Sequence, residues 1–248
     1  MATGESKIRS HFQKPCLSFS WKKFRRDTNG VVCVSTKNLE ECIGLGYADP
    51  AKCKVFPNGV NLEVFKPMDK AECRKKLGFA ENDFICATVG EISERKGQVR
   101  IIEAVDSLAN PDIKTLFIGK GDALPDREYN LYTGKVPHHE LTTHLNAADA
   151  FVLPTLREGC CNAIVEAMAC GLPIISSDRK FNHDILDESN SIMVDPLDSK
   201  QIATAINTLY NDSDRRKKLA SGALAKAQTL SIIQRAENII SFINESQD

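Results

Sequence analysis

Two glutamates with seven residues between them carry the clearest chemical pattern in this sequence. They are Glu158 and Glu166, within residues 153–177, LPTLREGCCNAIVEAMACGLPIISS. The order of apolar, polar and helical stretches predicts a strand, a loop, a helix and a second strand. Glu158 then lies in the loop at the carboxyl edge of the strand, and Glu166 lies on the helix. Carboxylates in such positions can accept hydrogen bonds from sugar hydroxyls.

The residues between these glutamates lie where the helix is expected to begin. They are Gly159, Cys160, Cys161, Asn162 and Ala163. Main-chain N–H groups at a helix start have no partner within the helix and attract anions. Gly159 has no Cβ, so a ligand could approach the backbone closely. The pattern predicts a phosphate bound to these amides, with a carboxylate holding sugar hydroxyls on either side.

A second segment, residues 87–98 with the sequence ATVGEISERKGQ, supplies positive charge. A strand is expected to end at Gly90, a polar loop carries Arg95 and Lys96, and a helix follows. Two cations at the carboxyl edge of a strand are well placed to neutralise a diphosphate. Because such a pair before a helix is also common on solvated surfaces, this segment alone indicates little.

Several other patterns admit a chemical interpretation. Thiolates at positions 160 and 161 would be stabilised by a helix start, but we favour small residues that fill a tight loop. The stretch His139 to His144 nearly matches a zinc-binding helix motif, yet its second histidine comes one position late and faces away by about 140°. The Asp212-Ser213-Asp214 triplet sits where a helix is expected to start, so we interpret it as a cap.

The remaining chain supplies the elements that must position these residues. Short apolar runs predict strands at 31–35, 85–90, 115–119, 131–134, 150–154, 173–177 and 191–195. Helical patterns are expected near 37–46 and at 98–108, 140–148, 162–170, 199–210 and 231–244. Alternating strands and helices predict an α/β fold, a Rossmann-like parallel sheet with helices on both faces. Ligands of such sheets bind beyond the carboxyl ends of the strands.

A break in the pattern divides the chain. Residues 55–67, VFPNGVNLEVFKP, open with a Pro-Asn-Gly turn signal and then lose periodicity, so we predict a linker there. Residues 1–54 hold one expected strand and one helix, too little for a domain, and residues 68–248 form the main domain. Residues 1–30 combine seven Lys and Arg with two acidic residues and several aromatics. Contact with phosphates or a membrane surface is one interpretation; a surface segment covered by another part of the protein is the one we favour.

Together these segments resemble the nucleotide-sugar-binding half of a GT-B glycosyltransferase, in the large retaining group often called family 4. The resemblance runs from about residue 31 to the end of the sequence. The Glu-seven-Glu segment with AMACGLP is its most specific part. The other parts are VSTKNLEECIGLGY, PNGVNLEVFKP, VGEISERKG, LFIGKGD and YTGKV.

The resemblance implies a role for each site residue. Glu166 would bind the ribose hydroxyls of the nucleotide, and Glu158 would contact hydroxyls of the transferred sugar. The amides after Gly159 would hold the diphosphate, and Lys96 would stabilise the nucleoside diphosphate as it leaves. Asn182 could face the sugar of the donor, but a solvated helix start is the interpretation that we favour for this residue. The donor would be a UDP-, GDP- or ADP-sugar, and the resemblance implies no metal ion and no other cofactor.

The sequence departs from the family in two ways. Glu91 stands where the family usually has an arginine directly after Gly90, so its carboxylate would repel a diphosphate, and Arg95 would have to compensate. Residues 1–54 would be only the last strand and helix of an N-terminal acceptor-binding domain. The stretch 120–130 is also too short for the helix usual there.

Composition excludes several classes of function. The net charge of -1 over 248 residues gives no general attraction to nucleic acid. Nine cysteines without CxxC spacing argue against a disulfide framework and favour a reduced, cytoplasmic protein. No apolar run is long enough to span a bilayer, and no secretory signal is visible. We expect a cytoplasmic protein, with contact at the inner face of a membrane as an alternative.

These observations predict a retaining glycosyltransferase that moves a sugar from a nucleotide-diphosphate sugar to an acceptor hydroxyl. The acceptor would be a carbohydrate or a lipid-linked sugar, as in polysaccharide or glycoconjugate synthesis. An alternative is a truncated or inactive nucleotide-sugar-binding module that works only with a separate N-terminal domain. A related GT-B sugar-nucleotide epimerase is a third interpretation, which would require further catalytic groups from the absent half.

Overall fold

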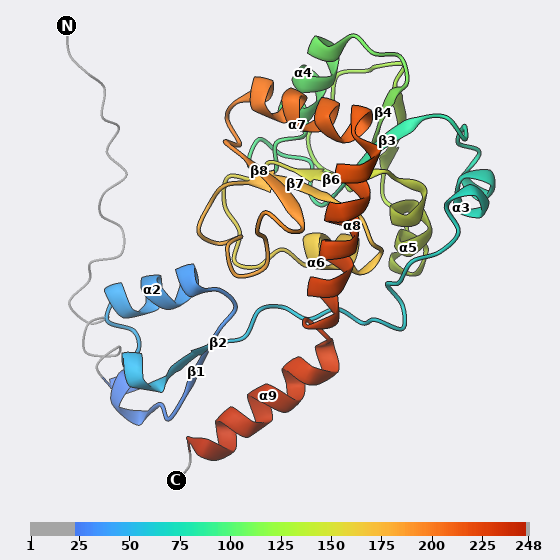
Figure 1. Ribbon diagram of the computed structural model, residues 1–248. Coiled ribbons are helices and arrows are strands. Elements are labelled where there is room, and N and C mark those ends of the chain that lie inside the picture. The colour runs from blue at the N-terminus through green and yellow to red at the C-terminus, as the bar shows by residue number, and fades with distance from the viewer. Residues whose placement is uncertain (1–22, 247–248) are drawn as a thin grey trace, which may run out of the picture.

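A six-stranded parallel sheet forms the centre of the molecule in the computed structural model, which describes residues 23–246 (Figure 1). The strands lie in the order β5-β4-β3-β6-β7-β8. Their bounds are β3 (Phe84–Val89), β4 (Ile113–Ile118), β5 (Asn130–Gly134), β6 (Ala150–Leu153), β7 (Ile174–Ser177) and β8 (Ser191–Val194). Counted from β3, this is the 3-2-1-4-5-6 order of the doubly wound Rossmann fold. The predicted α/β class is therefore confirmed.

Helices cover both faces of this sheet. They are α4 (Gln98–Leu108), α5 (His138–Ala147), α6 (Asn162–Ala169), α7 (Ser199–Asn211) and α8 (Ser213–Gln228). Alternate residues of each strand point to opposite faces, so Phe84 and Cys86 pack with α4 and α7. Ile85 and Ala87 pack with α5, α6 and α8 on the other face. The near-continuous apolar runs of the strands follow from this burial on both faces.

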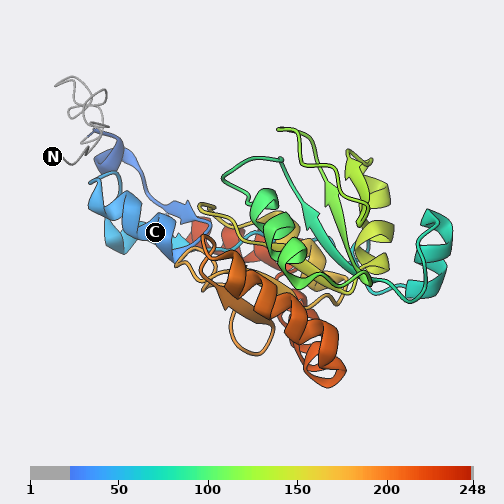
Figure 2. The same cartoon turned by 90° about the horizontal axis from the view of Figure 1, so that it is seen from above.

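A small unit, residues 31–55, lies apart from the main sheet and beside the last helix, α9 (Ile232–Glu245). It contains β1 (Val31–Cys33), α2 (Thr36–Gly44), the short helix η1 (Pro50–Lys52) and β2 (Cys53–Val55), and the two strands pair in parallel. Figure 2 shows this unit at one end of the molecule and α3 (Lys70–Leu77) at the other.

Residues 56–67 join the small unit to the main sheet and are held along their length. Val60 donates its N–H to the carbonyl of Leu230 and accepts from the N–H of Ile232, so this stretch pairs with the start of α9. The Phe56 and Phe242 rings lie 5.8 Å apart, which adds an apolar contact between the stretch and α9. The division at 1–54, 55–67 and 68–248 stays a prediction.

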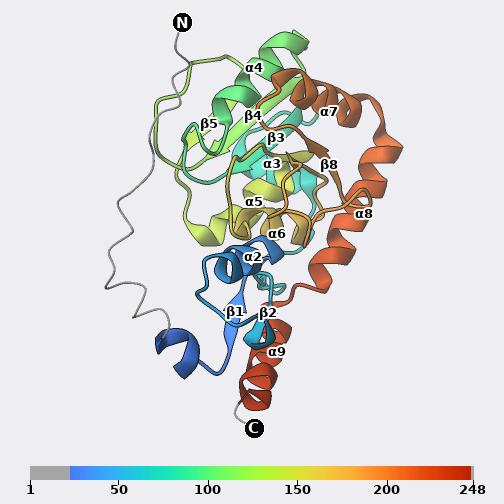
Figure 3. The same cartoon turned by 90° about the vertical axis from the view of Figure 1, so that its left-hand side faces the viewer.

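Helix α2 lies on the side of the small unit that faces the main domain (Figure 3). Thr36 donates its N–H and its hydroxyl to the two carboxylate oxygens of Asp184, at 2.8 Å and 2.5 Å. The Lys180 ammonium lies 3.0 Å from the Glu40 carboxylate. Contacts with the turn after β7 therefore fix the small unit on the main sheet.

All seven predicted strands are present, with ends shifted by a residue or two. β2 and α3 are additional elements that we did not predict. The stretch between β4 and β5 contains no helix, as its length led us to expect. Residues 1–22, which carry most of the basic and aromatic segment, lie outside the described residues.

Candidate functional site

The candidate site lies where β3 and β6 end side by side. The chain leaves β3 toward one edge of the sheet and leaves β6 toward the other, so the loops after these strands diverge from a topological switch point. In doubly wound sheets this switch point is where ligands bind. The two loops, residues 90–97 and 154–161, carry Arg95 and Lys96 on one side and Glu158 on the other.

The structure brings these charged side chains into direct contact. Lys96 Nζ lies 2.7 Å from Glu158 Oε1, and Arg95 Nη1 donates to the same oxygen at 2.9 Å. Thr155 Oγ1 donates to that oxygen as well, at 3.0 Å. The Lys96 and Glu158 side chains are only 10% and 14% exposed, whereas Arg95 is 43% exposed. We call this group the carboxyl-end cluster.

Glycines shape the loop that carries the two cations. Gly90 has φ 144°, a conformation that favours glycine, and a Cβ there would lie 3.5 Å from Lys96 Nζ. Gly97 has φ 85° and begins α4, where a Cβ would lie 2.7 Å from the carbonyl oxygen of Pro154. At Gly90 the backbone conformation, not lack of space, favours glycine, because a Cβ there would be in ordinary van der Waals contact with Lys96; Gly97 lets the two loops approach closely.

Helix α6 begins next to the carboxyl-end cluster. Its first helical bonds run from the N–H groups of Ile164 and Val165 to the Cys161 carbonyl, at 3.2 Å and 3.3 Å. N–H groups that precede Ile164 have no helical carbonyl to bond, and the N-cap residue Cys161 makes no side-chain cap hydrogen bond. The N–H groups of Ala163 and Ile164 nevertheless lie near the Cys161 sulfur, where they act to lower the pKa of its thiol. The predicted anion-binding amides, including Asn162 and Ala163, thus lie at an uncapped helix start beside Lys96.

Asn58 holds this helix start in place. Its Nδ2 donates to the Cys160 carbonyl at 2.9 Å and to Asn162 Oδ1 at 2.8 Å. We predicted the surrounding Pro-Asn-Gly sequence only as a turn in a linker. Because an amide side chain in a turn gives no hint of a partner 102 residues away, the sequence did not reveal this role.

The two cysteines at the helix start are poor candidates for nucleophiles. Both side chains are buried, and burial raises the pKa of Cys160 to about 11 and also raises the pKa of Cys161. The nearby Lys96 ammonium opposes the rise at Cys161 without overcoming it. A thiol is reactive only as thiolate, so these values support our interpretation that both residues fill a tight loop.

Glu166 lies on α6 with its side chain 15% exposed. Its carboxylate contacts His138, whose Nε2 is 3.3 Å from Oε1, and the His138 ring meets Phe65 edge-on at 5.3 Å. Burial raises the pKa of Glu166, and the interaction with His138 partly offsets that rise. The contact between His138 and Glu166 was not predicted from the sequence.

Two predicted site residues have neighbours that we did not expect. A Cβ on Gly159 would lie 3.2 Å from Asn38 Oδ1 and from a Val34 methyl group, so that side of Gly159 faces the small unit rather than an open ligand space. Asn182 has no exposed surface and donates to Ser176 Oγ and to the Ser177 carbonyl. The structure therefore does not bring Asn182 to the site, because the turn after β7 uses its amide.

Comparison with known families decides the assignment of the chain. The sequence profile of the family "Glycosyl transferases group 1" matches residues 69–226, which include all of the main sheet. The chain belongs to this family. It is a group 1 glycosyltransferase chain of the GT-B type, as its resemblance predicted.

Curated relatives of this glycosyltransferase chain include two bacterial proteins at 31% identity. One is the UDP-Gal:alpha-D-GlcNAc-diphosphoundecaprenol alpha-1,3-galactosyltransferase of Escherichia coli, over 80% of this chain and 55% of that protein. The other is the putative teichuronic acid biosynthesis glycosyltransferase TuaC of Bacillus subtilis, over 75% of this chain and 49% of that protein. The chain thus spans about half the length of the curated relatives it matches.

Solved structures share the fold at lower identity. HepE of Anabaena in complex with UDP superposes with a TM-score of 0.82 at 21% identity, covering 95% of this chain and 69% of that one. Sucrose-phosphate synthase of Thermosynechococcus elongatus superposes with a TM-score of 0.78 at 23% identity, covering 92% of this chain and 61% of that one. At these identities the likeness establishes the fold alone.

Other patterns in the sequence are explained by local structure. Asp212 accepts a hydrogen bond from the Arg215 N–H at 2.8 Å and caps α8, as predicted. Within residues 23–246, no three His, Cys, Asp or Glu side chains are placed to hold a metal ion. None of the helices in that range has the length and apolar character needed to cross a bilayer.

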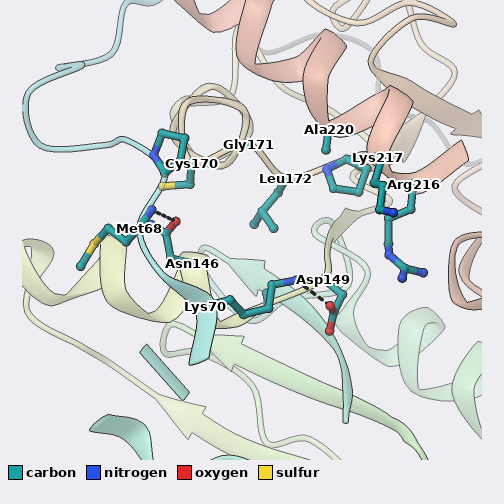
Figure 4. A pocket seen from close by; sticks show the side chains of 13 residues that line it. Met68, Lys70, Asn146, Asp149, Cys170, Gly171, Leu172, Arg216, Lys217 and Ala220 are labelled. Carbon is teal, nitrogen blue, oxygen red and sulfur yellow. Dashed lines mark hydrogen bonds and ion pairs between the residues drawn. The ribbon is translucent and has the colours of Figure 1, made fainter. Parts of the chain in front are cut away.

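A separate cavity of about 290 Å³ lies at the amino ends of the strands, the opposite end from the candidate site (Figure 4). Asp149 lies at its edge, with Oδ1 2.7 Å from Lys70 Nζ and Oδ2 2.6 Å from Arg74 Nη2. The Ile85 N–H also donates to Oδ2, at 2.8 Å. We call this group the amino-end cluster, and its contacts join α3 to the starts of β3 and β6.

Proposed function

We propose that this chain forms the donor-binding part of a retaining glycosyltransferase and binds a nucleotide-diphosphate sugar at the switch point of its sheet. One observation carries the proposal: the Lys96 and Glu158 pair lies directly beside the uncapped start of α6. Cations, free amides and carboxylates at one switch point match the phosphates and hydroxyls of a sugar nucleotide.

Each group has a distinct role in this proposal. The amides at the start of α6 and the Lys96 ammonium hold the diphosphate and stabilise the charge that develops as it leaves. Glu166 accepts hydrogen bonds from the ribose, and Glu158 accepts from hydroxyls of the sugar. The bond between the anomeric carbon and the diphosphate oxygen breaks. A bond to an acceptor hydroxyl forms with the same configuration.

The comparisons support UDP as the first nucleotide to test. The name of the Escherichia coli relative specifies UDP-Gal as donor and a diphosphoundecaprenol-linked sugar as acceptor, and HepE was crystallised with UDP and with UDP-glucose. A UDP-sugar donor and a lipid-linked or carbohydrate acceptor are therefore our proposal for this chain.

A binding module without activity of its own remains the second candidate function. Because the chain spans about half the length of its curated relatives, activity of this chain by itself has to be measured directly. In the second candidate the donor binds as proposed, but transfer requires a separate N-terminal domain. Hydrolysis of UDP-galactose or UDP-glucose by the purified chain, followed as UDP release, would exclude the second candidate.

Calorimetric titration of the chain with UDP, GDP and ADP tests the donor site. Replacing Glu166 by alanine should weaken binding of the preferred nucleotide by about 1.5–3 kcal/mol, because the bond between a carboxylate and a hydroxyl is charge-assisted. Glu237→Ala on the exposed surface of α9 is the matched control and should leave affinity unchanged. Equal affinities of the wild-type protein and Glu166→Ala would refute the assignment.

A further inference from the structure

Arg95 lies between two carboxylates, only one of which belongs to the proposed donor site. Its Nη1 donates to Glu158 Oε1 at 2.9 Å and to the Arg157 carbonyl at 2.9 Å. Its Nη2 lies 3.7 Å from Glu91 Oε2, one helical turn earlier in the chain. The guanidinium thus lies between Glu158 of the proposed site and the exposed carboxylate of Glu91.

The Glu91 side chain does not support the fold of this loop. It is 66% exposed, and Arg95 is the partner of its carboxylate in the described part of the chain. The main chain of Glu91 is held independently, because its carbonyl accepts from Gln98 Nε2 at 3.0 Å. Replacing the carboxylate by a neutral amide should therefore leave the loop intact.

Arg95 and Lys96 differ in how firmly they are held. Lys96 is almost fully buried against Glu158, so its position is fixed by packing. Arg95 is half exposed and can turn toward a ligand at the switch point. A diphosphate bound at the start of α6 would then compete with Glu91 for the Arg95 guanidinium, because one guanidinium fork pairs best with a single anion.

We infer that Glu91 restrains Arg95 and so lowers the affinity of the site for nucleoside diphosphates, the product more than the donor. The inference rests on the proposed function. A free nucleoside diphosphate ends in a phosphate whose second ionisation, with a pKa near 6, adds up to about one negative charge at pH 7.5. The donor lacks this charge, since its sugar occupies that oxygen. Glu91 is then a specificity-determining residue that favours release of the product over loss of the donor.

The test is a double-mutant cycle by calorimetry at low salt and pH 7.5, with UDP, UDP-glucose and uridine as ligands. Glu91→Gln should tighten UDP binding about twofold to fivefold, the range for an exposed ion pair. The gain should be smaller for UDP-glucose and absent for uridine, which carries no phosphate. In the Arg95→Gln background, Glu91→Gln should change the affinity for UDP no more than the control variant Glu94→Gln does.

Glu94→Gln is the matched control, since it removes an exposed carboxylate from the same loop without touching Arg95. Equal tightening by Glu91→Gln and Glu94→Gln would overturn the inference, because the net charge of the loop would then explain the effect. Tighter binding of uridine would overturn it too, since the effect would be structural. The inference would also be overturned if Glu91→Gln still tightened UDP binding in the Arg95→Gln background.

A failure of this inference can be distinguished from a failure of the proposed donor site. If the wild-type chain binds UDP and Glu166→Ala weakens it, the donor site stands, and an unchanged affinity in Glu91→Gln then refutes this inference alone. If GDP or ADP binds more tightly than UDP, the cycle uses that nucleotide and its own nucleoside. If none of the three binds, the proposed function fails and this inference fails with it.

Discussion

Two clusters of charged side chains lie at opposite ends of the same sheet, and they are built differently. In the amino-end cluster, both oxygens of Asp149 are bonded, to Lys70, Arg74 and the N–H of Ile85. In the carboxyl-end cluster, Lys96, Arg95 and Thr155 all meet one oxygen of Glu158.

The difference shows how much of each cluster is used by the fold. Arg74 is 4% exposed and also donates to the carbonyls of Ala147 and Glu81, so its donors are directed at protein acceptors. The carboxyl-end cluster lies instead beside helix N–H groups that have no helical partner. A cluster whose donors and acceptors are all paired within the protein serves the fold. A cluster that lies next to unpaired N–H groups can bind a ligand.

The largest expected effect is on stability, at the amino end. Arg74→Met should lower the free energy of unfolding by about 3–5 kcal/mol, because it leaves the Asp149 carboxylate and the buried Ala147 carbonyl short of a donor. Urea denaturation measures the loss. The control Lys70→Met removes the more exposed partner of Asp149 and should cost less than about 1 kcal/mol.

The distinction between the two clusters would fail if Arg74→Met left the free energy of unfolding unchanged but weakened nucleotide binding. In that case the amino-end cluster would take part in the site. If Lys70→Met lowered the free energy of unfolding as much as Arg74→Met, the greater burial of Arg74 would not explain its contribution to stability.

A smaller effect, on binding, is expected at the carboxyl end. Lys96→Met should weaken UDP binding by about 1.5–3 kcal/mol, because a charge-assisted contact with the diphosphate is lost. Its effect on stability should be modest, since Glu158 keeps Arg95 and Thr155 as donors. Calorimetry and urea denaturation of the same variant separate the two effects. Lys217→Met, at the edge of the cavity in Figure 4, is the control and should leave affinity unchanged.

The smallest expected effect concerns the pH dependence of Glu166. Burial raises the pKa of this carboxyl in the folded state, so its ionised form opposes folding. Glu166→Gln should therefore stabilise the unliganded protein, by on the order of 0.5 kcal/mol. The gain should be fully present above the raised pKa and lost as pH falls toward the ordinary range of a glutamate.

Binding of UDP by the wild-type protein should weaken over that same fall in pH, because a protonated carboxyl is a poorer acceptor for ribose hydroxyls. Thermal melts and titrations from pH 4.5 to 8 measure both trends. A stability gain of the variant that grows toward acid would show that burial does not raise the pKa of Glu166.

The sequence predicted the main sheet because strands buried on both faces are near-continuous apolar runs, as in β6 and β7. It missed β2 because a three-residue strand, CKV, leaves no periodic signal. It missed α3 because KAECRKKL is almost entirely polar, and that helix is defined instead by the Asp69 cap and the buried contacts of Arg74.

For the site, residue type and spacing singled out Glu158, Glu166 and Lys96. The order of strands, which makes Lys96 and Glu158 neighbours, depends on pairing between distant segments and has no local signature. The same is true of Asn58, which was taken only as a turn residue, and of Gly159, whose open side is filled by residues far away in the sequence.

The contact between Gly159 and the small unit has a mechanical consequence. Val34 and Asn38 lie against the loop that carries Glu158, and Thr36 is bonded to Asp184 on the neighbouring turn. A rotation of the small unit relative to the main sheet would break both contacts at once. Any movement of the small unit would therefore disturb the loop that carries Glu158, so the order of that loop depends on the small unit staying in place.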